Sequence, residues 1–121
     1  MNKERLQLVR DAVAASGISH FDLGTYRRCV FAYCARLPEF NALGLEANTR
    51  WETVTFQNCL GYAVTGKHAV LAFLEVDITD PKNAIAFTYA ESYDEHRSRG
   101  VFDIPTESIL AKIDAQLAEL A

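Results

Sequence analysis

Cys29 is the residue whose surroundings in the sequence offer the clearest chemistry. It follows Arg27 and Arg28, and it would lie in the first turn of a helix predicted over residues 26–37. A helix N-terminus and neighbouring cations both stabilise a thiolate, which is the nucleophilic form of cysteine. The sequence therefore indicates a candidate catalytic cysteine, and the alternative is an inert thiol packed in the core.

The base that a cysteine nucleophile needs would be one of the three histidines. His68 is expected in the first turn of an apolar helix, where the helix dipole disfavours protonation, so a neutral, hydrogen-bonded imidazole is also compatible with it. His20 lies in a connector and His96 in a polar loop. Spacing alone does not bring any of them to Cys29, so Cys29 and His68 stay the catalytic candidates of an enzyme hypothesis.

Motifs that would define a reaction class are absent from the sequence. It contains no Gly-x-Gly-x-x-Gly, Walker-type phosphate loop, His-Glu-x-x-His or Gly-x-Ser-x-Gly. The cysteines are Cys29, Cys34 and Cys59, an odd number without a Cys-x-x-Cys pair, which predicts neither a disulfide framework nor a zinc site. We therefore expect no metal and no cofactor, and the balance favours a protein that is not an enzyme.

The charge of the chain is unevenly distributed. Residues 1–36 hold six basic and three acidic side chains, whereas residues 37–121 hold six basic and thirteen acidic ones, for a net charge of −4. Because an acidic domain repels phosphate backbones, we do not expect nucleic-acid binding. The basic residues Arg27, Arg28 and Arg36 would either contact an acidic protein partner or form a solvated helix face.

Residues 91–103 are the most polar stretch of the chain, and they read as a loop. Both signs of charge and an aromatic side chain occur together there, which suits a protein-recognition loop and equally a solvated loop that neutralises itself. The residues expected to contact a partner are Tyr93, His96, Arg97 and Arg99.

The length of 121 residues, half of them hydrophobic, predicts one globular domain over residues 1–121. No segment approaches the ~20 apolar residues that a membrane span needs. The first residues contain no apolar secretory core, which predicts a cytoplasmic protein.

Most of the chain shows helical periodicity between clear start and stop signals. The helical segments are residues 3–16, 26–37, 38–43, 65–76, a segment that starts at Asp80 and Pro81, and residues 105–120. Gly17 and Gly44 fit the left-handed position after a helix, with Ile18 and Leu45 packing back on it. Residues 51–56 are rich in β-formers and either pair with residues 62–65 or form a loop.

These patterns predict a mostly α fold. It would be a compact domain of five or six short helices with at most one small β-hairpin around residues 52–65. Trp51 would be a core anchor in that region.

Five pieces of the sequence, taken in order, match the successive parts of one pattern. They are FDLGTY at residues 21–26, the segment from Cys29, PEFNALGL at residues 38–45, AVLAFLEV at residues 69–76 and IPTESILAKI at residues 104–113. This order resembles the FDMGTW, CGTxAC, PEFxxxGL, AxxFLGI and TPxxVxxRI pattern of a family of small uncharacterised bacterial and phage proteins. Only residues 38–45 match almost literally, and Gly24 stands where the family has the first of two cysteines. The resemblance implies a largely helical fold and a phage or mobile-element setting, and it implies no activity.

The leading hypothesis is therefore a small protein-binding or regulatory module with an unidentified protein partner. The alternative is a small-molecule-binding protein or a cysteine-dependent enzyme with a pocket near Cys29, Tyr33 and His68. A third hypothesis is a homo-oligomer that uses the apolar residues of segments 70–76 and 109–120.

Overall fold

The computed structural model describes residues 1–22, 29–48, 50, 53–57, 61, 63–76 and 103–120. Five helices and five strands lie in these residues. In chain order they are α1 (Lys3–Ala15), β1 (His20–Asp22), α2 (Val30–Cys34), α3 (Pro38–Asn41), β2 (Leu45–Asn48), β3 (Thr53–Gln57), β4 (Ala63–Thr65), α4 (Gly66–Phe73), β5 (Asp103–Pro105) and α7 (Thr106–Glu119).

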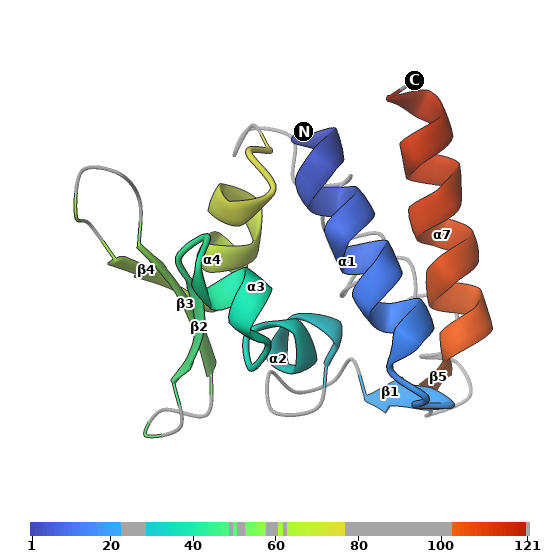
Figure 1. Cartoon of the computed structure of the whole chain (residues 1–121), viewed down its shortest axis with the longest axis horizontal. Coiled ribbons are helices and arrows are strands. Elements are labelled where there is room, and N and C mark those ends of the chain that lie inside the picture. The colour runs from blue at the N-terminus through green and yellow to red at the C-terminus, as the bar shows by residue number, and fades with distance from the viewer. Residues whose placement is uncertain are drawn as a thin grey trace.

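The elements form two groups (Figure 1). In one group, α1 and α7 lie side by side in opposite directions, and the antiparallel strands β1 and β5 close one end of the pair. In the other group, the antiparallel strands β2, β3 and β4 form a sheet in that order, with α2, α3 and α4 between this sheet and α1. Side chains from both groups form a single buried apolar cluster, so the described elements share one core.

The fold is α+β, so the prediction of a mostly α fold with at most one small hairpin was wrong. The expected hairpin does exist, because Phe56 on β3 pairs with Val64 on β4. However, β2 extends it to three strands, and β1 with β5 forms a second sheet. β1, β2 and β5 have three or four residues and are too short to show alternation, and β1 and β5 also come from opposite ends of the chain, so local periodicity did not reveal them.

Helix α1 begins where the sequence predicts. Asn2 is its N-cap, and the Asn2 side-chain oxygen accepts a hydrogen bond from the Arg5 amide at 3.0 Å. Gly17 has the expected positive φ of 71°. Ile18 does not end in the core, since it is 36% exposed, and its amide donates to the Ser16 hydroxyl.

The second predicted helix is much shorter than expected in the part that the structure describes. α2 contains only residues Val30–Cys34, and residues 23–28 lie outside the described part. The chain leaves the helix before Leu37, which is extended and precedes Pro38, the first residue of α3. This order follows from the steric clash that drives the residue before a proline out of helical angles.

Helix α4 ends in a turn whose left-handed residue is Glu75, and the sequence does not show this end. α4 was expected to run to Val76 and ends at Phe73, because Glu75 has a φ of 56°. The Glu75 amide donates to the Ala72 carbonyl at 3.1 Å, and the Val76 amide donates to the Leu71 carbonyl at 3.0 Å. This pair of bonds is a Schellman motif, whose left-handed position is usually a glycine. A glutamate there carries no recognisable stop signal.

Several predictions concern residues outside the described part of the chain. They are those for Arg27, Arg28, Trp51, the helix starting at Pro81 and the loop at residues 91–103, of which only Asp103, in β5, is described. Among the helices that the structure describes, none has the length and apolar character that a membrane span requires.

We predict that Gly44→Ala destabilises the fold more than Gly61→Ala. Both glycines have a positive φ, 97° and 84°, which costs an alanine about 1–2 kcal/mol. A Cβ at Gly44 would also lie 2.8 Å from the Gln57 carbonyl oxygen, whereas nothing lies within 4 Å of a Cβ at Gly61. We expect an additional loss of about 1 kcal/mol or more for Gly44→Ala, measured by urea denaturation. Equal losses for the two variants would contradict the close approach.

Candidate functional site

Cys29 does not occupy the position expected of a nucleophile. It is the N-cap residue of α2, with extended backbone angles, and it is 5% exposed. α2 contains five residues, so its dipole is short. Arg27 and Arg28, the cations expected to favour a thiolate, lie outside the described residues. The structure therefore places Cys29 at the edge of the core rather than in an open site.

Cys34 at the end of α2 is completely buried. Burial raises the pKa of the Cys34 thiol, and the nearby Cys29 and Glu39 raise this pKa further. A thiol in such surroundings stays protonated at neutral pH and reacts slowly. Cys34 therefore fits the interpretation of an apolar core residue.

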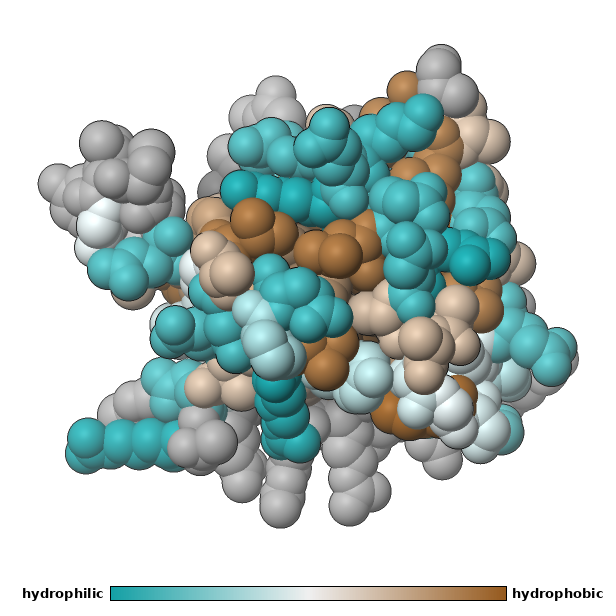
Figure 2. All heavy atoms as spheres, viewed as in Figure 1, coloured by the Kyte–Doolittle hydropathy of each residue, from teal (hydrophilic) through white to brown (hydrophobic). Residues whose placement is uncertain are grey.

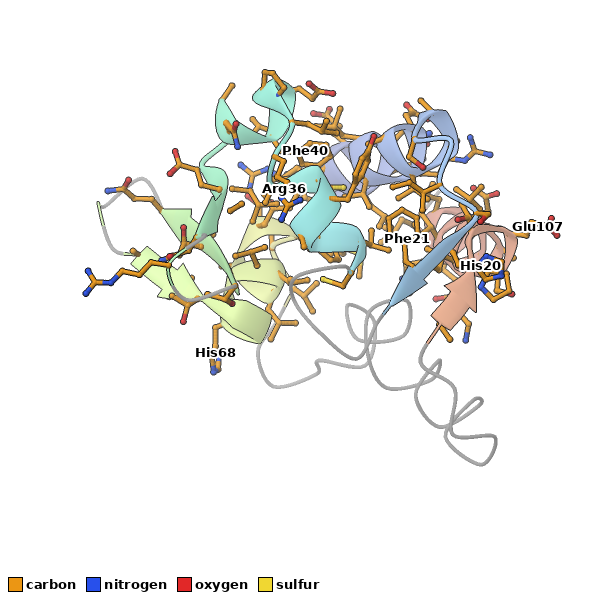
Figure 3. All side chains as sticks on the ribbon, turned by 90° about the horizontal axis from the view of Figure 1, so that it is seen from below. His20, Phe21, Arg36, Phe40, His68 and Glu107 are labelled. Atoms are coloured by element: carbon orange, nitrogen blue, oxygen red, sulfur yellow. The ribbon has the colours of Figure 1, made fainter. Side chains whose placement is uncertain are left out.

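The histidines do not complete a catalytic pair with Cys29 in the described structure. His68 on α4 is exposed and points away from the body of the molecule (Figure 3). His20 on β1 is also exposed, and its Nδ1 atom lies 3.0 Å from the Ser19 hydroxyl, beside the start of α7. His96 lies outside the described residues. In addition, no group of three or more His, Cys, Asp or Glu residues in the described part could hold a metal ion.

Of the residues expected to bind a partner, the structure describes only Arg36. It is exposed in the turn between α2 and α3. Arg27, Arg28 and the four loop residues, Tyr93, His96, Arg97 and Arg99, lie outside the described part of the chain. Arg36 leads directly into a segment that sequence reasoning had interpreted only as a helix and its stop.

That segment, residues 38–45, contains α3, the turn after it and the first residue of β2. It is called the α3–β2 corner below. Its two ends are anchored in the core, since Phe40 and Leu45 have no exposed surface. Phe40 packs on the Phe73 ring of α4, with 5.8 Å between the ring centroids. The corner is therefore attached to the molecule at both ends by buried side chains.

Hydrogen bonds hold the backbone of the α3–β2 corner between these anchors. The Asn41 side-chain amide donates to the Ala35 carbonyl at 2.7 Å and to the Leu45 carbonyl at 2.9 Å. The Gly44 carbonyl accepts from the Gln57 amide on β3 at 3.2 Å. One side chain thus connects the end of α2 to the start of β2, and the turn has little freedom to move.

The α3–β2 corner presents Leu43 to solvent. Leu43 is 39% exposed, and the only other exposed large hydrophobic residue in the described part is Ile18. The side chains around it on the corner, Glu39, Asn41 and Ala42, are exposed as well. On the face drawn in Figure 2, apolar areas lie among hydrophilic ones.

The sequence PEFNALGL of residues 38–45 explains the construction of this corner. Pro38 begins α3, Phe40 and Leu45 are the buried anchors, and Gly44 provides the positive φ and the close approach to β3. The exposed Leu43 lies between the two buried anchors. Sequence reasoning missed Leu43 because it considered only the end of the helix at Gly44 and the packing of Leu45. Leu43 follows Phe40 at the i, i+3 spacing of one helix face, so its spacing gave no signal that it would be exposed.

Comparisons with protein-family models, with curated proteins and with solved structures found no match for this chain.

We predict that Cys34 makes stability fall at alkaline pH. Since the pKa of Cys34 is raised in the folded state, only the unfolded chain loses this proton above about pH 8.5. The free energy of unfolding then decreases by about 1.4 kcal/mol per pH unit from this group. Urea denaturation at several pH values between 7 and 10 should show a shallower decrease for Cys34→Ala than for the unmodified protein. Parallel pH profiles would contradict a buried, protonated thiol.

Proposed function

We propose that this chain is a small protein-binding module that uses the α3–β2 corner as its contact surface. The observation that carries the proposal is Leu43, an exposed apolar side chain on a turn held by Asn41 and Gly44. Binding through a rigid turn loses little conformational entropy, so a single apolar anchor contributes more than it would on a flexible loop. An anchor of this kind fits a small apolar pocket on a protein partner.

The charge of the molecule supports a protein rather than a nucleic acid as the partner. The chain has a net charge of −4, and Glu39 and Glu46 are exposed on or next to the corner. These carboxylates would repel a phosphate backbone. The family resemblance supports an origin in a phage or mobile element.

Enzymatic use of Cys29 has weaker support. The buried position of Cys29 and the outward direction of His68 offer no nucleophile and base in one site. Similarly, the apolar residues that suggested a homo-oligomer are used inside the chain, since Val70, Leu71, Ile109 and Ile113 are all buried in its own core. We therefore retain the protein-binding proposal alone.

We predict that Leu43→Asp abolishes partner capture without unfolding the protein. The tagged chain is used to capture proteins from a lysate of its source cells, and recovered proteins are compared between variants by quantitative mass spectrometry. A carboxylate at Leu43 cannot enter an apolar pocket, so a specific partner should be recovered at least about tenfold less, equivalent to about 1.4 kcal/mol.

Ile18→Asp is the matched control, because Ile18 is exposed to nearly the same extent, 36%, but lies away from the corner in the turn after α1. Ile18→Asp should leave capture unchanged. Circular dichroism melting of both variants checks that each stays folded. The proposal would be contradicted if the Leu43→Asp variant captured as much partner as the unmodified protein. It would also be contradicted if Leu43→Asp and Ile18→Asp lost capture equally.

A further inference from the structure

The C-terminal end of α4 is completed by the first residues of the chain. Two carbonyls at this end, those of Leu71 and Ala72, are satisfied by the turn that follows α4. The next two carbonyls accept from the start of the chain. The Phe73 carbonyl accepts from the Arg5 guanidinium at 2.8 Å, and the Leu74 carbonyl accepts from the Asn2 amide at 2.6 Å. Helix ends need such external donors because their last carbonyls have no partner in the helix.

The Arg5 guanidinium also lies against two aromatic rings. Its central carbon is 5.1 Å from the centroid of the Phe73 ring and 5.7 Å from the centroid of the Phe56 ring. The two rings meet edge to face, with centroids 5.9 Å apart and an interplanar angle of 75°. A cation within about 6 Å of a ring centroid is attracted by the negative face of the ring.

Two features thus favour a cation at this position. They are the aromatic rings of Phe56 and Phe73, and the Phe73 carbonyl, which belongs to the negative C-terminal end of α4. The surroundings are rigid, because Phe73 has no exposed surface and Phe56 is 6% exposed. Arg5 itself is half-buried, so solvent reaches the position from one side.

We propose that Phe56, Phe73 and the Phe73 carbonyl form a guanidinium-binding site that the chain fills with its own Arg5. This contact attaches the first turn of α1 to α4 and β3. The ligand class is a planar guanidinium group, because the site offers ring faces and a carbonyl acceptor together, and a planar donor can stack and donate at the same time. Emptying the site by mutation would allow a free guanidinium compound to enter it.

Chemical rescue tests the site. Arg5→Ala should melt at a lower temperature than the unmodified protein, and methylguanidinium chloride at tens of millimolar should raise its melting temperature by about 2–4 °C. Ionic strength is held constant with sodium chloride. Urea at the same concentration serves as a planar probe without charge and should give no increase. Two-dimensional NMR should show the Phe56 and Phe73 ring protons shifting with methylguanidinium in the variant only.

Arg10→Ala is the matched control on the same helix. Arg10 pairs with the exposed Asp114 at 3.1 Å and has no part in the proposed site. Its melting temperature should not respond to methylguanidinium. If Arg5→Ala does not fold, Arg5→Gln, which keeps part of the side-chain stem, is titrated in the same way. A response to urea, an equal response of the Arg10→Ala variant or no response from either Arg5 variant would overturn the proposal.

Discussion

The structure depends on how α4 is ended, because α4 alone cannot satisfy its last carbonyls. The following turn, with Glu75 in a left-handed conformation, satisfies two of them, and the first turn of α1 satisfies two more through Asn2 and Arg5. This arrangement attaches the α1–α7 group to the three-stranded sheet at a defined point. It also covers Phe56 and Phe73, whose rings connect the sheet to the core. Residues about seventy positions apart in the chain are thus required for one helix end.

In the α3–β2 corner, too, side chains connect short elements that cannot satisfy their own backbone groups. Helices and strands of four or five residues gain little stability from their own hydrogen bonds, so side chains must connect them. Asn41 does this between α2 and β2, and Gly44 lets the turn approach β3. The consequence is a rigid turn that holds Leu43 in solvent, and this combination of rigidity and exposure is the basis of the proposed protein-binding role.

The cysteines show why a reactive residue type is insufficient evidence for chemistry. Cys29 has the neighbours in sequence that a nucleophile would need, yet it is buried at the N-cap of a five-residue helix. The fold raises the pKa of Cys34 by removing its sulfur from water. Both thiols are buried among apolar side chains, which is the usual place of a cysteine that acts as a small apolar residue.

The sequence by itself determined the elements whose signals are local. Asn2 as the N-cap of α1, the positive φ of Gly17 and Gly44, and the apolar stripe of Ile109 and Ile113 on α7 were all predictable. Only the tertiary structure decided the strands β1, β2 and β5, because each is three or four residues long and owes its conformation to a partner strand. It also decided that Leu43 faces solvent and that Arg5 ends α4. Those outcomes depend on distant segments meeting, and hydrophobic periodicity along the chain carries no information about which segments meet.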